Sequence, residues 1–308
     1  MMRVVFLGTP DFGVPALKKI MENHQIVGVV CQPDKVGARG KVEYSAVKKF
    51  ALQHDLPLFQ FEKISRDGVE SLVSLKPDIM VTAAYGQILS QELIDIAPHG
   101  IINIHGSLLP KLRGAAPIQY AVLLGLPKTG ITILNTVRKV DAGEIILQKE
   151  IDVLPYETNG ELFERMSQLG AEAVVEALDL IESGKAVYVA QDEERATFCS
   201  KITAEQERID WSKSSNDVIN LVRALNPSPA AWTMVDGKRL KIYALRPSEI
   251  DYNGVAGEVV ECGKKTLAIM CGDGKAVNVI ELQAENARRM DVVSFLNGRR
   301  IAQGTVLK

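Results

Sequence analysis

Hydrophobic residues in the first half of the chain form short runs that alternate with amphipathic stretches. The runs, which are typical of buried strands, are RVVFLG (3–8), IVGVVC (26–31), LPLFQ (56–60), DIMVTAAY (78–85), IINIH (101–105) and GITILNTV (130–137). The amphipathic stretches, which are typical of helices, lie at 14–24, 45–55, 68–76, 90–97 and 159–184. This alternation predicts βαβ units, and therefore an α/β fold with a doubly wound, mostly parallel sheet covered on both faces.

A different pattern begins near residue 209, after a polar connector. The stretch SSNDVINLVRALN predicts one helix with Ser215 or Asn216 as its N-cap. Strand-like stretches separated by glycines follow at 238–245, 257–262, 266–271 and 276–283. One helix followed by regularly spaced strands predicts a C-terminal β-barrel of the OB type, a fold that often binds nucleic acid. We therefore expect an α/β domain at 1–189, a linker at 190–208 and a β domain at 209–308.

Charge is distributed unevenly along the 308 residues. The whole chain has a net charge of −2, but residues 209–308 carry +3 and residues 1–208 carry −5. A basic C-terminal part is compatible with an anionic partner such as nucleic acid, although such a small excess is common.

Cysteine and histidine spacing argues against a metal site. The four cysteines and four histidines show neither a C-x-x-C pair nor an H-E-x-x-H motif. We expect reduced thiols and no metal. A cytoplasmic location is expected too, because the N-terminus lacks a signal-peptide pattern and no stretch approaches the roughly 18 apolar residues of a membrane span.

Asn103 and His105 are the first candidates for chemistry. Side chains alternate along a strand, so Ile102 and Ile104 point to one face while Asn103 and His105 share the other. In open α/β sheets, ligands bind beyond the carboxyl ends of the strands, where this pair lies. The alternative is that the two side chains only cap the following turn. Because the pair is followed by SLLP, we favour a functional site.

Asp141 is the third candidate. It follows the apolar run at 130–137, in the sequence RKVDAGEI. If that strand neighbours 101–105, the carboxylate lies beside the imidazole, where it can fix the tautomer of His105 or raise its pKa. The alternative is that Asp141 caps a tight turn through its own backbone.

A basic loop follows the second predicted strand. Between Asp34 and Lys49 there are two acids against five cations, namely Lys35, Arg39, Lys41, Lys48 and Lys49. A solvated loop is one interpretation. Its location on the rim that carries Asn103 favours a clamp on a polyanion. The nearby GTPDFG lacks the features of a phosphate-binding loop and is explained by a strand-to-helix turn.

Six motifs in order along the chain resemble one family of enzymes. FLGTPDFGVPAL, QPDK, AAYGQIL, INIHGSLLPKLRGAAPIQ, VDAGEI and RALNPSPAAW are similar to those of the 10-formyltetrahydrofolate-dependent formyltransferases, and most similar to the bacterial methionyl-tRNA branch. HGSLLP is specific to the wider family. The basic loop, the GTPDF start and the C-terminal domain with LQAENARRM favour the tRNA branch. In the basic loop the chain reads Gly-Ala-Arg-Gly where the family usually has Pro-Ala-Gly-Arg-Gly.

The resemblance implies roles for individual residues and partners for the chain. Asn103, His105 and Asp141 match the catalytic positions. The expected folate-binding residues are Ser107, Leu108, Leu109 and Pro110, and the expected tRNA-binding residues are Arg39, Lys35 and Lys41. The resemblance also implies 10-formyltetrahydrofolate as formyl donor, initiator methionyl-tRNA as acceptor, a catalytic domain followed by a tRNA-binding domain, and a cytoplasmic monomer that does not bind membranes.

A mechanism follows as a hypothesis from these roles. Asn103 and His105 donate hydrogen bonds to the oxygen that gains charge, while Asp141 holds His105 and relays protons. Two alternatives stay open: a formyltransferase for an amino-sugar nucleotide with the same three residues, and a tRNA-binding module without catalysis.

Overall fold

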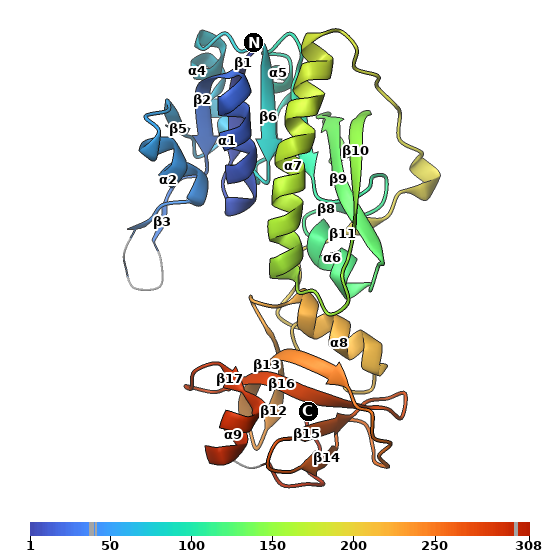
Figure 1. Cartoon of the computed structure of the whole chain (residues 1–308). Helices are drawn as coiled ribbons and strands as arrows, with labels where there is room; N and C mark the ends of the chain where they lie inside the picture. The colour runs from blue at the N-terminus through green and yellow to red at the C-terminus, as the bar shows by residue number, and fades with distance from the viewer. Residues whose placement is uncertain (37–39, 41, 299–300) are drawn as a thin grey trace. The chain divides into compact units, whose positions relative to one another are not determined.

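The fold comes from a computed structural model of the whole chain, which describes residues 1–36, 40, 42–298 and 301–308. The chain divides into two compact units (Figure 1). The first consists of Met1–Pro117, Lys128–Asp152 and Phe163–Cys199, and the second of Ile118–Pro127, Val153–Leu162 and Ser200–Lys308. Within the described ranges no helix is long and apolar enough to cross a membrane.

The first unit contains a seven-stranded sheet in the order β10-β9-β7-β6-β1-β2-β5. Its strands are β1 (Arg3–Gly8), β2 (Gln25–Cys31), β5 (Leu58–Gln60), β6 (Ile79–Ala83), β7 (Ile101–His105), β9 (Lys128–Asn135) and β10 (Ile145–Asp152). β5, β2, β1, β6 and β7 pair in parallel, whereas β9 runs antiparallel to β7 and β10 antiparallel to β9. The prediction of a mostly parallel sheet is therefore confirmed. The sequence pattern missed β10, an edge strand whose polar residues give no apolar run.

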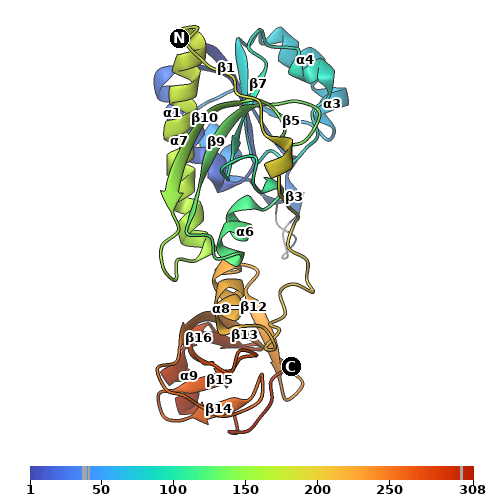
Figure 2. The same cartoon turned by 90° about the vertical axis from the view of Figure 1, so that its right-hand side faces the viewer.

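Helices cover both faces of this sheet, as predicted (Figure 2). One face packs against α1 (Val14–Asn23), α2 (Ala46–Gln53) and α7 (Asn159–Glu182), and the other against α3 (Ile64–Asp67), α4 (Val69–Ser74) and α5 (Gln91–Ile94). A Cβ added at Gly170 of α7 would lie 3.0 Å from Ile104 Cγ2, so Ile104 faces that helix, and by alternation so does Ile102. Asn103 and His105 consequently lie on the other face of β7.

Shorter elements complete the first unit. They are η1 (Asp11–Gly13), β3 (Lys35–Val36), β4 (Val42–Glu43), β8 (Arg113–Gly114), η2 (Glu193–Arg195) and β11 (Phe198–Cys199). The stretch GTPDFG forms the turn between β1 and α1, and it contains η1. β8 and β11 pair in parallel although some eighty residues of sequence separate them.

The second unit is built on a curled antiparallel sheet in the order β12-β13-β16-β15-β14, with β17 paired to β16. Its strands are β12 (Ala231–Val235), β13 (Lys238–Pro247), β14 (Val259–Cys262), β15 (Leu267–Met270), β16 (Ala276–Ala284) and β17 (Met290–Asp291). Register shifts between β13 and β16 at Ile242, Ala244 and Leu245 bend the two strands, as β-bulges do. The predicted β domain is confirmed as a half-barrel.

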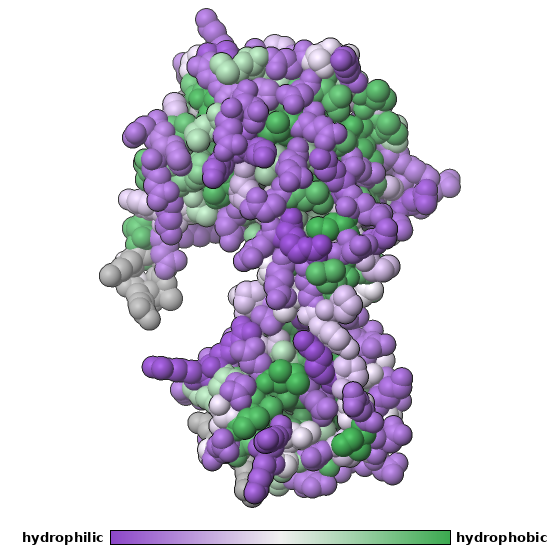
Figure 3. All heavy atoms as spheres, viewed as in Figure 1, coloured by the Kyte–Doolittle hydropathy of each residue, from purple (hydrophilic) through white to green (hydrophobic). Residues whose placement is uncertain are grey.

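The second unit also contains α6 (Pro117–Leu123), α8 (Ser215–Ala224) and α9 (Val292–Gly298). The N-cap of α8 is Ser214, whose side chain accepts a hydrogen bond from the Asp217 amide, so the expected cap at Ser215 or Asn216 was wrong. Ser215 is instead buried, and its hydroxyl donates to Asp273. On the face shown in Figure 3, hydrophilic side chains predominate and hydrophobic ones form separate patches.

Candidate active site

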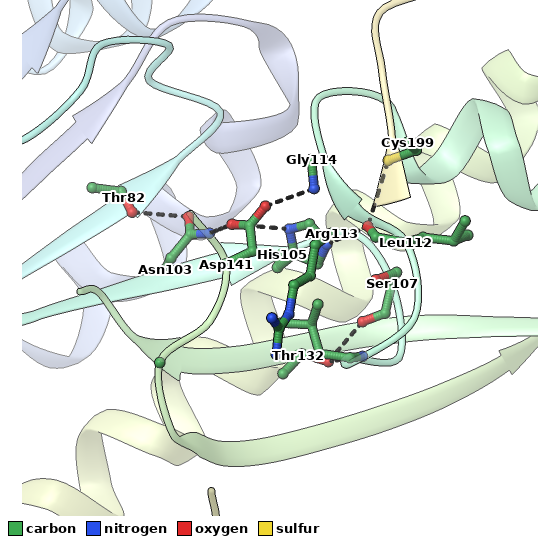
Figure 4. A network of polar contacts seen from close by, with 12 residues as sticks. Thr82, Asn103, His105, Ser107, Leu112, Arg113, Gly114, Thr132, Asp141 and Cys199 are labelled. Atoms are coloured by element: carbon green, nitrogen blue, oxygen red, sulfur yellow. Dashed lines mark hydrogen bonds and ion pairs between the residues drawn. The ribbon is translucent and has the colours of Figure 1, made fainter. Parts of the chain in front are cut away.

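Asn103 and His105 lie next to each other on one face of β7, as strand alternation predicts (Figure 4). The hydroxyl of Thr82 on neighbouring β6 donates to Asn103 Oδ1 over 2.8 Å. This bond fixes the amide orientation and directs the Nδ2 donor away from β6. Asn103 Nδ2 lies 3.5 Å from Asp141 Oδ1, which is too long for a strong hydrogen bond. The amide hydrogens therefore remain available to a bound reactant.

His105 is buried, and both of its ring nitrogens have defined neighbours. Nε2 lies 3.0 Å from the carbonyl oxygen of Leu112, and Nδ1 lies 3.5 Å from Asp141 Oδ1. A carbonyl only accepts, so Nε2 carries the hydrogen, and Nδ1 of the neutral ring is left as an acceptor. Burial lowers the pKa of His105, while the Asp141 carboxylate and the Leu112 carbonyl raise it. The neutral ring is better suited to accept a proton than to donate one to a charged oxygen.

Asp141 joins the pair from the loop between β9 and β10. Its backbone has a φ of 52°, in the left-handed region that non-glycine residues seldom occupy. Its Oδ2 accepts a hydrogen bond from the Gly114 amide over 2.8 Å, while Oδ1 faces Asn103 and His105. The side chain is 11% exposed. The structure thus brings the three predicted residues together around one carboxylate oxygen.

The segment after β7, residues 106–112, forms a wall beside this cluster. Thr132 of β9 holds it, because its hydroxyl donates to the Ser107 carbonyl over 2.6 Å and accepts from the Leu109 amide over 3.1 Å. The Ser107 hydroxyl donates to the Lys111 carbonyl over 2.6 Å. Ser107 and Leu109 are buried, whereas Leu108 and Pro110 are partly exposed. Leu108 and Pro110 therefore present the apolar surface of this wall, and Ser107 and Leu109 support it.

Residues 191–199 pack against the cluster, and the sequence patterns did not point to them. The Thr197 hydroxyl accepts from the Leu112 amide over 2.9 Å, and its carbonyl accepts from the Arg113 amide over 2.9 Å. Cys199 Sγ donates to the same Leu112 carbonyl that His105 contacts. These bonds join residues some 85 positions apart, and no local spacing signals them.

Residues 34–36, 40 and 42–49 of the basic loop lie among the described residues. Lys35 is exposed in β3, which pairs with β4. Lys48 Nζ bonds Asp34 Oδ2 over 2.5 Å and Gln60 Oε1 over 2.8 Å, which ties the start of the loop to α2 and β5. Arg39 and Lys41 lie outside the described residues. The described positions contain no group of three or more His, Cys, Asp or Glu side chains that could hold a metal ion.

Solved structures share this fold at low sequence identity. An N-formyltransferase from Helicobacter canadensis in complex with folinic acid and dTDP-3-aminofucose gives a TM-score of 0.71 at 18% identity, covering 92% of this chain and 100% of that one. HypX from Aquifex aeolicus in complex with tetrahydrofolic acid gives 0.64 at 19% identity, covering 96% of this chain and 47% of that one. These similarities establish the fold.

Sequence comparisons give the family. Residues 2–178 match the formyl transferase model, and residues 201–300 match the formyl transferase C-terminal domain model. The methionyl-tRNA formyltransferase of Bacillus subtilis is 41% identical over 100% of this chain and 98% of its own length. That of Bacillus thuringiensis subsp. konkukian is 40% identical over 100% and 99%. The matches to both family models and the full-length relatives show that the chain belongs to the formyl transferase family.

Proposed function

We propose that this chain transfers the formyl group of 10-formyltetrahydrofolate to the α-amine of initiator methionyl-tRNA, which gives N-formylmethionyl-tRNA for translation initiation. The observation that carries this proposal is about 40% identity to two methionyl-tRNA formyltransferases over the whole chain, both domains included. The N-formyltransferase from Helicobacter canadensis and HypX from Aquifex aeolicus share the fold at only 18% and 19% identity. A role in translation initiation implies a cytoplasmic enzyme, and the family resemblance implies a monomer.

Residues 107–110 of the wall are suited to bind a folate beside Asn103, His105 and Asp141. Leu108 and Pro110 present apolar side chains suited to a flat ring, and Thr132 and Gln148 hold the backbone behind them. Leu108 lies against Gly130 of β9, where an added Cβ would come within 2.6 Å of Leu108 Cδ2. Folate supplies the formyl group when bound. Ser107 and Leu109 would hold the wall in place rather than contact the folate through their side chains.

The three polar residues have separate tasks in this proposal. The α-amine of an aminoacyl ester is largely neutral near pH 8, so it needs no strong base to become a nucleophile. Asn103 Nδ2 donates to the oxygen that gains negative charge in the transition state. His105 Nδ1 accepts the proton that the amine releases as it bonds to the formyl carbon, and Asp141 stabilises the resulting imidazolium across the 3.5 Å between them. His105 then returns this proton to the folate nitrogen as the bond from that nitrogen to the formyl carbon breaks.

The acceptor is proposed to bind through basic residues. Lys35, Arg39 and Lys41 would neutralise phosphates near the acceptor end of the tRNA, and the basic 209–308 region would bind elsewhere on it. Arg39→Ala should raise the KM for methionyl-tRNA and leave the KM for folate unchanged. The dependence of the methionyl-tRNA KM on salt concentration should weaken by the amount expected for the loss of about one phosphate contact. Kinetics over a salt titration would check this, and an unchanged tRNA KM at every salt concentration would argue against the clamp.

The direct test compares acceptors under one set of conditions. The purified chain, 10-formyltetrahydrofolate and either methionyl-tRNA or a dTDP-amino sugar are mixed, and formylated product is measured. Formylation of methionyl-tRNA alone supports the proposal. Formylation of the sugar alone would favour the sugar-nucleotide function, and tRNA binding without turnover of either acceptor would favour a binding module.

A further inference from the structure

The loop that carries Asp141 is held by a side chain remote in sequence. Gln191 Nε2 donates to the carbonyl oxygen of Asp141 over 2.8 Å and to that of Gly143 over 2.7 Å. Both hydrogens of the amide are therefore used on this one loop. Asp141 has the left-handed φ of 52°, a conformation that a non-glycine residue keeps only when its surroundings impose it.

Gln191 is itself fixed by a buried guanidinium. Arg113 is 1% exposed, and its Nε and Nη2 donate to Gln191 Oε1 over 3.0 and 2.8 Å. Its Nη1 and Nη2 also donate to the Glu193 carboxylate over 3.1 and 3.0 Å. The oxygen of the Gln191 amide thus accepts from Arg113 while its nitrogen donates to the loop, so the side chain has little freedom to move.

Arg113 and Gly114 together act on both parts of Asp141. Arg113 reaches the backbone of Asp141 through Gln191, and the Gly114 amide binds its carboxylate over 2.8 Å. The two residues form β8. This strand pairs with β11, which belongs to the same segment, residues 191–199, as Gln191. One short strand thereby sets both where the Asp141 backbone lies and where its carboxylate points.

We propose that Gln191 is a positioning residue for Asp141. This role rests on the proposed formyl transfer, and it explains how the Asp141 carboxylate is held in place for that reaction. A primary amide suits this place because Arg113 needs an acceptor and the loop carbonyls need donors. A carboxylate would satisfy Arg113 but would face two carbonyl oxygens without a hydrogen. An ammonium would satisfy the carbonyls but would repel Arg113.

Gln191→Glu distinguishes the contact of Gln191 with Arg113 from its contact with the loop that carries Asp141. The variant keeps the size of the side chain and an acceptor for Arg113, so the fold should persist, but it removes both donors to the loop. We expect kcat to fall at least about tenfold while the KM of each substrate stays within about twofold, since displaced catalytic groups cost turnover rather than binding. Glu193→Gln is the matched control, because it changes the other partner of Arg113 and leaves the bonds from Gln191 to the loop in place. Glu193 contacts the loop only through the exposed side chain of Lys139, so the kcat of this variant should match that of the wild type.

A double-mutant cycle tests whether Gln191 acts through Asp141. In the background of Asp141→Asn, adding Gln191→Glu should lower kcat by less than twofold further, because residues in one network are not additive. Independent losses that multiply, or a wild-type kcat in Gln191→Glu, would overturn the proposal.

A second measurement does not depend on catalysis. Amide hydrogen exchange at Gly114 reports its bond to the Asp141 carboxylate, and it should be faster in Gln191→Glu than in the wild type and in Glu193→Gln. Exchange at the wild-type rate in Gln191→Glu would overturn the proposal. If the wild type formylates no acceptor but Gly114 exchange still accelerates, the proposed function fails while the positioning role stands.

Discussion

The two halves of the candidate active site are held in different ways. Asn103 and His105 lie two positions apart on β7, inside a sheet, and the strand alone gives them a common face. Asp141 lies on a loop and depends on Gly114 and Gln191, which come from distant parts of the chain. The strand half is local and rigid, whereas the loop half is assembled by long-range hydrogen bonds. Substitutions in the strand half should therefore remove chemistry and leave the fold intact, while those in the loop half should change geometry as well.

The largest effect is expected in the strand half. Asn103→Ala removes the amide donor, and loss of one donor to a developing oxyanion costs about 2.7 to 4 kcal/mol, or roughly a hundredfold to a thousandfold in kcat. Turnover with methionyl-tRNA and thermal unfolding would be measured together. Normal turnover in a folded variant would remove Asn103 from the catalytic assignment.

The next effect links the two halves. Asp141→Asn keeps the size of the side chain but removes its charge, and general acid–base assistance is worth about a hundredfold or more. The carboxylate raises the pKa of His105 against the effect of burial, so without it that pKa falls further. A neutral His105 is the active form, and the acid limb of the kcat–pH profile should therefore move to lower pH. A limb that stays in place or moves to higher pH would contradict His105 as the proton acceptor.

A smaller effect is expected from a change in backbone geometry. Gly114 has a φ of 122°, and an added Cβ would lie 2.1 Å from the Cys199 carbonyl oxygen. Gly114→Ala must separate β8 from β11, and strain of this kind costs about 1 to 3 kcal/mol of unfolding free energy. Chemical denaturation would measure that loss, and kcat should fall with it because the Asp141 carboxylate loses its amide donor. Wild-type stability in this variant would mean that the β8–β11 pairing is dispensable.

The smallest effect concerns an exposed carboxylate at the edge of the loop half. Hydrogen bonds from Arg113 and Lys139 lower the pKa of Glu193 from 4.5 to about 2. Its stabilising contribution is complete above the unfolded value near 4.5 and is lost as pH falls toward 2. The difference in melting temperature between wild type and Glu193→Gln should be small at pH 7 and should shrink at pH 3. A difference that grows at pH 3 would contradict the depressed pKa.

Much of the first unit was predictable because buried parallel strands leave continuous apolar runs. β1, β2, β6 and β7 follow such runs closely. The helix expected over 68–76 is confirmed as α4. The pattern failed at β10, whose alternating polar residues suit an edge strand, and at α3, a four-residue helix just before Gly68. Edge strands and short helices carry weak periodicity, so local pattern does not define them.

The sequence by itself determined that Asn103 and His105 share a face, because alternation is a local property of a strand. It also proposed Asp141, on condition that its strand neighbours β7. Only the tertiary structure decided that condition, by pairing β9 with β7. Because β9 is antiparallel, it ends beside the start of β7, and the following loop has to return to bring Asp141 to Asn103 and His105. Gly114 and Gln191 hold this loop in place through hydrogen bonds to Asp141. These bonds span 27 and 50 residues of sequence, and no local pattern encodes them.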